Sequence, residues 1–238
     1  MIADNAAASE GAPRRKFYGR RKGRQLRKGQ QALVDTLLPQ LAIDLPPSGQ
    51  VDPVGLFAPP VREVWLEIGF GGGEHLAAQA KAHPEIGFIG CEVFENGVAS
   101  MLAHIRDGGL TNVRLHPEDV RDLLPLLPPR SIGRLFLLFP DPWPKKRHAE
   151  RRFVNRANLD RLADLLADDA ELRIGSDDPT YIAWALAHVT DHPAFRWLAE
   201  APSDWSRRPA DWPATRYERK AVLAGRKPAY FRFRRRPR

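Results

Sequence analysis

The feature that most restricts the fold is a regular alternation of short apolar segments with amphipathic ones, which begins at Val61. The apolar segments are short and rich in β-branched and aromatic residues, as buried strands are. Expected strands cover residues 63–68, 86–91, 112–116, 134–139 and 171–175, and expected helices cover 74–82, 96–106, 155–167 and 179–189. Two later apolar-aromatic segments, 195–199 and 229–233, are expected terminal strands. This order predicts an α/β fold with a doubly wound, mostly parallel, seven-stranded sheet.

The length of 238 residues suits one such domain with short extensions. We expect residues 1–30 to be a flexible basic arm, residues 31–60 to be a helix and linker that pack on the domain, and residues 61–238 to be the α/β domain. No apolar run approaches the ~20 residues that span a bilayer, and the start lacks the apolar core of a secretory signal. Cys91 is the only cysteine, which excludes an internal disulfide and a thiolate metal cage. We therefore expect a cytoplasmic protein with no membrane contact and no metal.

The net charge of +8 is unevenly distributed. Residues 1–30 hold nine lysines and arginines against two acids, and residues 224–238 hold seven and no acid, so the part between them is net negative. Basic ends of this kind favour a nucleic-acid partner, although solubility and nuclear targeting are alternatives. Binding to a bilayer surface is less favoured, because residues 14–28 lack an apolar face.

The most distinctive motif follows the strand expected at 134–139 and reads Phe-Pro-Asp-Pro-Trp-Pro-Lys-Lys-Arg-His over residues 139–148. Prolines cannot continue the hydrogen-bond ladder of a strand, so the chain must turn around Asp141. Asp141 therefore stands at the carboxyl end of a parallel strand, where open α/β sheets bind ligands. Trp143 fits two roles equally, stacking on an extruded base or filling the core.

A cluster of cations follows Asp141. Such a run is usually a solvated helix face, but its position beside the expected site favours contact with phosphates. His148 is a better candidate for a further phosphate contact than for a metal ligand. The expected phosphate contacts are Lys146, Arg147, Arg151 and Arg152.

A glycine-rich loop at residues 69–73 links the first expected strand to a helix. Glycines at Gly69 and Gly71 let the backbone turn tightly and approach a ligand. A dinucleotide fingerprint has its third glycine where this chain has Glu74, whose charge would oppose a pyrophosphate at the helix N-terminus. The loop thus favours a nucleoside ligand without phosphate, such as S-adenosylmethionine, and disfavours an NAD-binding oxidoreductase.

Acidic residues recur at the carboxyl ends of four expected strands, which would place them around one ligand. Glu67 suits the cationic part of S-adenosylmethionine, Glu92 suits the ribose hydroxyls, and Glu118 or Asp119 suits the adenine amine; Asp141 is the fourth. The alternative for any single residue is helix capping, which acids often provide.

The chain resembles the bacterial tRNA (guanine-N7)-methyltransferase family, whose members are Rossmann-like class I methyltransferases that use S-adenosylmethionine. The matching segments are residues 23–24, 28–31, 67–73, 90–93, 139–145 and 215–220. The resemblance implies methylation of guanine-46 in the tRNA variable loop, by a monomer or homodimer with no obligate protein partner.

The resemblance also implies residue roles. Glu67, Glu92, Asp119 and Asp141 would contact the cofactor together with Gly69 and Gly71 of the loop, and Asp141 would also be the catalytic residue. The tRNA contacts would be Lys145, Asp177, Thr215, Arg216, Tyr217 and Glu218. One departure is Asp178, which stands where the family usually has tryptophan.

Guanine N7 carries a lone pair and no proton, so the chemistry asks for positioning rather than a general base. We expect Asp141 and Asp177 to accept the guanine N1–H and N2–H₂ donors, with Glu218 as a third candidate. Two rival interpretations stay open: a class I RNA methyltransferase that acts on an exocyclic amine, and a non-catalytic RNA-binding protein.

Overall fold

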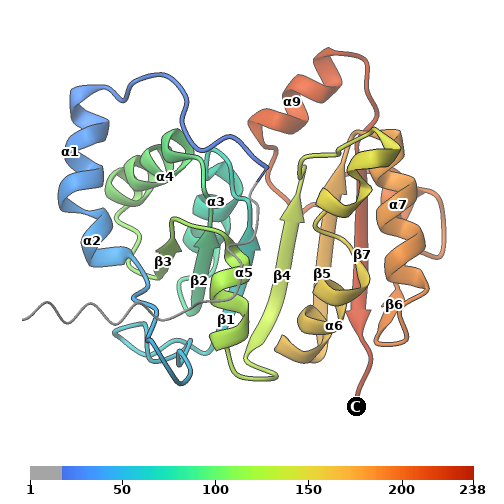
Figure 1. Cartoon of the computed structure of the whole chain (residues 1–238), viewed down its shortest axis with the longest axis horizontal. Coiled ribbons are helices and arrows are strands. Elements are labelled where there is room, and N and C mark those ends of the chain that lie inside the picture. Colours follow the sequence, from blue (N-terminus) through green and yellow to red (C-terminus); the bar gives the residue numbers. More distant parts are fainter. Residues whose placement is uncertain (1–17) are drawn as a thin grey trace, which may run out of the picture.

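The structure is a computed structural model of the chain, and it describes residues 18–238. Its centre is a seven-stranded sheet with the strand order β3-β2-β1-β4-β5-β7-β6 (Figure 1). The strands are β1 (Glu63–Ile68), β2 (Ile86–Cys91), β3 (Val113–His116), β4 (Ile132–Leu138), β5 (Leu166–Ser176), β6 (Phe195–Trp197) and β7 (Ala229–Arg235). Strands β1 to β5 are mutually parallel, and β7 lies antiparallel between β5 and β6. The expected α/β class and mostly parallel sheet are therefore confirmed.

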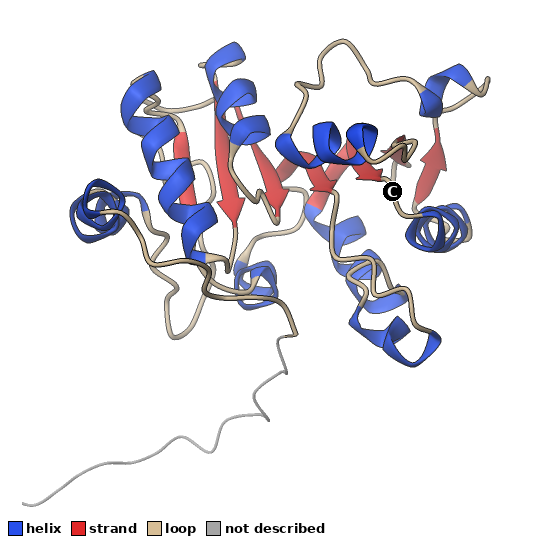
Figure 2. Ribbon diagram, turned by 90° about the horizontal axis from the view of Figure 1, so that it is seen from above, coloured by secondary structure: helices blue, strands red, loops and turns tan. Residues whose placement is uncertain are grey.

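Helices cover both faces of the sheet, as the view from above shows (Figure 2). The α-helices are α1 (Lys28–Thr36), α2 (Leu38–Leu41), α3 (Glu74–Ala82), α4 (Glu95–Gly108), α5 (Val120–Leu123), α6 (Arg156–Leu165), α7 (Pro179–Thr190), α8 (Ser203–Ser206) and α9 (Arg216–Leu223). Two 3₁₀ helices, η1 (Leu124–Leu126) and η2 (Lys146–Arg151), complete the elements. None of the helices within residues 18–238 is long and apolar enough to cross a membrane.

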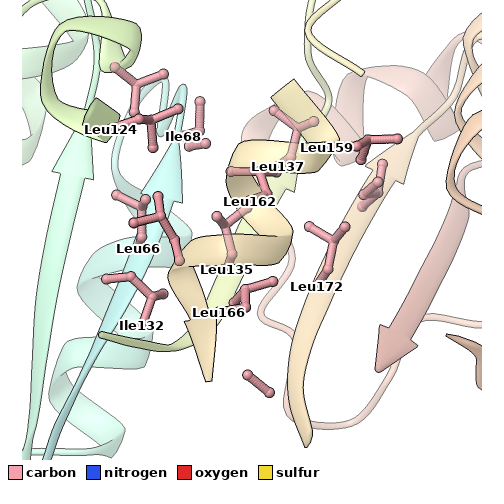
Figure 3. Packing of buried hydrophobic residues seen from close by; sticks show 14 of the residues in the cluster. Leu66, Ile68, Leu124, Ile132, Leu135, Leu137, Leu159, Leu162, Leu166 and Leu172 are labelled. Atoms are coloured by element: carbon pink, nitrogen blue, oxygen red, sulfur yellow. The ribbon is translucent and has the colours of Figure 1, made fainter. Parts of the chain in front are cut away.

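Alternate residues of each central strand feed two separate cores, because successive side chains of a strand point to opposite faces. From β1, Leu66 joins the core beneath α5, α6 and α7, whereas Trp65 joins the core beneath α3 and α4. In the sheet Leu66 pairs with Leu135 of β4, and leucines of α6 close over them (Figure 3). Strands buried on both faces account for the near-continuous apolar runs in the sequence.

Several boundaries differ by a few residues from those expected from the sequence, and two differences change the elements themselves. The helix expected at 155–167 ends at Leu165, and β5 begins at Leu166, five residues before the expected start of that strand. The helical segment beginning near Gln30 is split into α1 and α2, with Pro39 in the first turn of α2. A proline is tolerated at the start of a helix and not in its interior, which explains the division.

The two basic ends of the chain have different surroundings. Residues 18–27 cross above α3 and α4 before α1 begins (Figure 1), and the rest of the expected flexible arm lies outside the described residues. The C-terminus lies at the opposite end of the sheet from the carboxyl ends of β1 to β5 (Figure 1). There Arg235 and Arg238 donate to the Ala163 carbonyl, and Arg238 also binds Asp168. The described C-terminal residues therefore continue an inner strand and bond to the body, and a role of this basic end in RNA binding stays a prediction.

Candidate active site

The glycine loop adopts backbone conformations that L-residues rarely take. Gly69, Gly71 and Gly73 have φ of 71°, 57° and 83°. A Cβ on Gly73 would stand 2.5 Å from Met101 Sδ, and one on Gly71 would stand 2.7 Å from the Tyr217 ring. A Cβ on Gly69 would meet no atom within 4 Å. The loop is thus tightly packed at Gly71 and Gly73 and open at Gly69, as a backbone that approaches a ligand must be.

Glu74 blocks the N-terminus of α3 against phosphate. It lies in the first turn of the helix, and its carboxylate folds back so that a Cβ on Gly72 would stand 2.6 Å from Glu74 Oε2. A carboxylate there already complements the positive end of the helix dipole. A pyrophosphate would meet like charge instead of free N–H groups, so the loop fits a nucleoside without phosphate.

Glu92 follows β2 and binds the glycine loop directly. Its Oε2 accepts from the Gly71 amide at 2.8 Å, and its Oε1 accepts from the amides of Val93 and Phe94 at 2.8 and 2.9 Å. Burial raises the pKa of Glu92 above its usual range, the amide bonds oppose that rise, and the charge of Asp141 adds a smaller upward contribution. The charges of the Glu92 and Asp141 carboxylates therefore interact at the edge of the sheet where β2 and β4 end.

Glu67 is buried at the end of β1, with 2% of its side chain exposed. Its Oε2 lies 2.6 Å from Nδ1 of His75, a residue of α3 that is buried equally well. The other ring nitrogen of His75 has no hydrogen-bond partner among the described residues. His75 thus holds the Glu67 carboxylate, which has almost no exposed surface of its own.

Asp119 lies at the end of β3 as expected and caps α5. Its carboxylate accepts from the Arg121 amide at 3.0 Å and pairs with the Arg121 guanidinium at 2.5 Å. Its neighbour Glu118 pairs with Arg21 at 2.7 Å. The N-terminal segment is thereby tied to this rim, and its backbone also binds Asn96 beside β2.

Asp141 stands in a strained and exposed turn after β4. Phe139 and Trp143, which flank it, have φ of 50° and 43°. Non-glycine residues in this region cost roughly 1–3 kcal/mol each and cluster at functional sites. The Phe139 amide anchors the turn by donating to the Gly175 carbonyl of β5 at 2.7 Å. The Asp141 carboxylate is exposed and has no hydrogen-bond partner among residues 18–238.

Trp143 lies outside both hydrophobic cores and is only partly buried. Tyr18 and His148 contact it edge-on, with ring centroids 6.2 and 5.7 Å away. The Arg151 guanidinium lies over both Tyr18 and Trp143, at 4.1 and 4.9 Å from the ring centroids. Filling of the core is thus wrong for Trp143, which instead joins the turn to the N-terminal segment.

The expected phosphate contacts divide into two groups. Lys145, Lys146 and Arg147 are exposed around η2, as RNA contacts must be. Arg151 is partly covered by its aromatic neighbours, and Arg152 is only 4% exposed. Arg152 donates to the carbonyls of the turn, so its assignment as a phosphate contact is wrong: the guanidinium faces inward.

His148 lies beside this cationic segment. Partial desolvation, followed by the charges of Arg151 and Arg147, lowers the pKa of His148 below its usual value. The imidazole is therefore mostly neutral near pH 7, and an approaching phosphate would favour its protonated form.

The segment with Thr215 and Glu218 is not a plain loop but the start of α9. Thr215 caps the helix by accepting from the Glu218 amide at 3.1 Å. Arg216 is exposed, and the Tyr217 ring lies against Gly71 of the glycine loop. This contact brings the expected tRNA-binding segment to the expected cofactor loop.

Glu218 is buried in the first turn of α9. Its Oε1 accepts from the Tyr230 hydroxyl at 2.5 Å and lies 3.1 Å from Nε of Arg208, while its Oε2 has no partner among the described residues. Burial, and then this hydrogen bond to Glu218, raise the pKa of Tyr230, so the hydroxyl remains a donor. No local spacing indicates Arg208, because it lies ten residues from its partner Glu218 in an irregular segment.

Asp177 and Asp178 directly follow β5 and have different roles. Asp177 pairs with Arg226 at 2.5 Å, beyond α9 in sequence. Asp178 caps α7 by accepting from the Tyr181 amide at 2.9 Å. The departure from the family's usual tryptophan thus has a structural reason, since aspartate is a good N-cap and tryptophan is not.

Sequence patterns also did not reveal other partners of site residues, among them His75, Tyr18 and Arg226. Each contacts its site residue from a distant or different element, so no local spacing reveals it. The only local signal was the presence of an aromatic residue, Tyr18, within a strongly basic segment.

Comparison with known proteins gives the site a context. Residues 61–230 match a protein family described as "Putative methyltransferase". Among solved structures, an rRNA methylase from Streptococcus thermophilus superposes with a TM-score of 0.50 at 14% identity, over 74% of this chain and 87% of that one. The 16S rRNA methyltransferase KamB gives the same TM-score at 15% identity, over 74% of this chain and 89% of that one. These structures share the fold.

Relatives in sequence are much closer. A protein of Rhodospirillum rubrum described as a tRNA (guanine-N(7)-)-methyltransferase is 61% identical, over 94% of this chain and 89% of that protein. One of Paramagnetospirillum magneticum with the same description is 54% identical, over 99% of this chain and 98% of that protein. With identity this high along nearly the whole length, the chain belongs to the tRNA (guanine-N(7)-)-methyltransferase family.

Proposed function

We propose that this protein methylates N7 of guanine-46 in the variable loop of tRNA, with S-adenosylmethionine as the methyl donor. The observation that carries the proposal is the contact between Tyr217 and Gly71, whose amide binds Glu92; the Glu92 carboxylate in turn interacts with Asp141, which is exposed and has no hydrogen-bond partner among residues 18–238. It joins a nucleoside-binding loop to a segment suited to the substrate. A cytoplasmic location, where tRNA occurs, goes with this proposal.

The residues at the rim fit the cofactor. Gly69 leaves open space at the glycine loop, Glu92 is held where ribose hydroxyls would be bound, and Glu74 excludes phosphate. Glu67 and Asp119 complete the acidic surroundings expected for a cationic ligand and its adenine amine. When bound, S-adenosylmethionine supplies an electrophilic methyl group, and an acidic rim stabilises the positive charge of that donor.

The protein's task is to orient guanine. Asp141 is the residue best placed to accept the N1–H and N2–H₂ donors of the base, because its carboxylate is exposed and has no partner in the described part of the chain. Asp177 must first leave its ion pair with Arg226, and Glu218 is engaged by Tyr230. We therefore assign Asp141 the leading role in base recognition. Adenine lacks this donor pair and would leave the carboxylate unpaired.

Exposed cations surround the acidic centre and suit the tRNA backbone. Lys145, Lys146 and Arg147 follow the Asp141 turn, and Arg216 begins α9 on its other side. The described N-terminal segment adds Arg20, Lys22 and Arg24, all exposed. Contacts of this kind supply affinity that falls with salt and carry no sequence information.

The test is incubation of the purified protein with labelled S-adenosylmethionine and unmodified tRNA, followed by nucleoside analysis. Label in 7-methylguanosine, lost when guanine-46 is replaced by adenine, is the expected result. Label in an exocyclic methylamine would support the rival methyltransferase, and binding without transfer would support a non-catalytic RNA-binding protein. Asp141→Ala should abolish transfer and retain part of the cofactor affinity; near-normal transfer by this variant would refute the role of Asp141.

A further inference from the structure

Arg152 is a buried cation with an unusual set of partners. Its Nε donates to the carbonyl of Pro142 at 3.1 Å, and its Nη2 donates to the carbonyl of Trp143 at 2.9 Å. Its guanidinium also lies over the ring of Trp184, 4.5 Å from the centroid. The ion pairs found within residues 18–238 do not include Arg152. A buried charge with no counter-ion is expensive unless its donors are satisfied, and here backbone carbonyls and an aromatic face satisfy it.

These carbonyls belong to the strained turn. Pro142 and Trp143 directly follow Asp141, and Trp143 has φ of 43°. A non-glycine residue keeps such a conformation only when its surroundings hold it there. The planar fork of arginine can hold two carbonyls at fixed spacing, which a point-like ammonium cannot do.

The platform behind Arg152 is itself fixed. Trp184 of α7 donates from Nε1 to the Val154 carbonyl at 2.6 Å, and its ring stacks on His188 at 3.9 Å. On the outer side of the turn, Arg151 covers the Trp143 ring. Adjacent arginines thus hold Trp143 from two sides, one through its ring and one through its carbonyl.

We infer that Arg152 is a positioning residue: it fixes the Pro142 and Trp143 carbonyls and so sets the direction of the Asp141 carboxylate. This inference rests on the proposed role of Asp141 in orienting guanine. Arg152 contributes no phosphate contact. Its removal loosens the turn, misplaces Asp141 relative to the base, and leaves the surface that binds the tRNA backbone intact.

The decisive variant is Arg152→Lys, which keeps the charge and removes the fork. We expect kcat for tRNA methylation to fall about 10-fold for Arg152→Lys and about 100-fold for Arg152→Ala, since a displacement near 1 Å has effects of that order. KM for tRNA and the salt dependence of tRNA binding should not change. Guanidinium ion at tens of millimolar should restore part of the kcat of Arg152→Ala.

Arg147→Ala is the matched control, because Arg147 lies on η2, which ends immediately before Arg152, and is exposed. It should raise KM and flatten the salt dependence instead of lowering kcat. If Arg152→Lys methylates tRNA like the unaltered protein, or if Arg152→Ala reproduces the effects of Arg147→Ala, the inference is overturned in favour of a phosphate contact.

A readout without activity separates this inference from the proposed function. Hydrogen–deuterium exchange over residues 139–147 should be at least several-fold faster in Arg152→Lys than in the unaltered protein, whether or not tRNA is methylated. Unchanged exchange would overturn the inference on its own. Failure of the unaltered protein to methylate tRNA would instead overturn the proposed function, with the exchange result still reporting on the turn. Arg152→Lys serves both measurements if Arg152→Ala does not fold.

Discussion

Gly97→Ala tests whether close backbone approach positions the cofactor loop. Gly97 lies in the first turns of α4 and is buried against the glycine loop. A Cβ at this position would stand 2.3 Å from the Gly71 carbonyl oxygen. Ordinary contact begins beyond about 3.4 Å, so either the helix or the loop must move by roughly 1 Å. Neither can move freely, because Ser100 of α4 also donates to the Gly72 carbonyl at 2.8 Å.

Two effects of opposite sign decide how much Gly97→Ala changes the free energy of unfolding. Alanine favours a helix over glycine by up to about 1 kcal/mol, whereas overpacking of a tight contact costs about 1–3 kcal/mol. We expect overpacking to win, and the free energy of unfolding to fall by about 1–2 kcal/mol. For a chain of this size that corresponds to a Tm lower by roughly 2–8 °C. Cofactor affinity should fall at least about tenfold, because the displaced loop carries the Gly71 amide that holds Glu92.

The assay is thermal unfolding followed by circular dichroism, together with calorimetric titration of S-adenosylmethionine. Gly29→Ala is the matched control: Gly29 lies in α1, and a Cβ there would meet nothing within 4 Å. This control should have an unchanged or slightly raised Tm and normal cofactor affinity. The reasoning fails if Gly97→Ala is stabilised like the control and binds the cofactor as tightly as the unaltered protein.

Three further predictions follow from the site and its surroundings. Because burial raises the pKa of Glu92, its carboxylate is protonated, and lost as an acceptor, as pH falls through that raised value. The affinity for S-adenosylmethionine measured by calorimetry should therefore drop on acidification, and Glu92→Gln should bind S-adenosylmethionine weakly at every pH. The pKa of His148 is lowered in the free protein, so its imidazole would take up a proton when it contacts a phosphate. Binding of tRNA measured by filter retention should therefore tighten from pH 7.5 to 6, and His148→Asn should remove that pH dependence. Deleting residues 236–238 removes the bonds of Arg238 to the Ala163 and Asp164 carbonyls; Tm should fall by a few degrees, while an altered salt slope of tRNA binding would show that this end does reach RNA.

The sheet was predictable because its strands are buried on both faces. Segments such as residues 135–139 are apolar throughout and end at a proline, so their boundaries are visible locally. The start of β5 was not predictable, because its first residues, Leu166 to Asp169, continue the apolar and acidic pattern of α6. Only Leu166 of that stretch pairs with β4; the register then shifts before Glu171, and Asp169 has φ of 66°, so no local period marks the strand.

The residues of the candidate site that lie at strand ends were predictable from the sequence. Topology brings the carboxyl ends of parallel strands to one edge, so Glu92 and Asp141 could be grouped from spacing alone. The direction of a side chain after a turn has no such rule. Arg151 and Arg152 are adjacent and chemically identical, yet one packs over aromatic rings at the surface and the other is buried beneath the turn. Composition treats them as equal cations, whereas the backbone conformation of η2 decides which one can meet RNA.

The separation of charge explains how one rim can serve two ligands of opposite sign. Carboxylates lie on its inner side, where a cationic donor is stabilised: Glu67 and Glu218 are buried, Glu92 is partly buried and Asp141 is exposed. Exposed lysines and arginines stand outside it, where a polyanion is attracted while the bulk solvent screens them from the acidic centre. Three carboxylates of the rim are already paired with arginines, since Asp119 binds Arg121, Glu218 binds Arg208 and Asp177 binds Arg226. Among the described residues, Glu92 and Asp141 form no ion pair. Arg152 lies behind the Asp141 turn, and its donors bind backbone carbonyls instead of a carboxylate, so it leaves the charge of Asp141 unpaired.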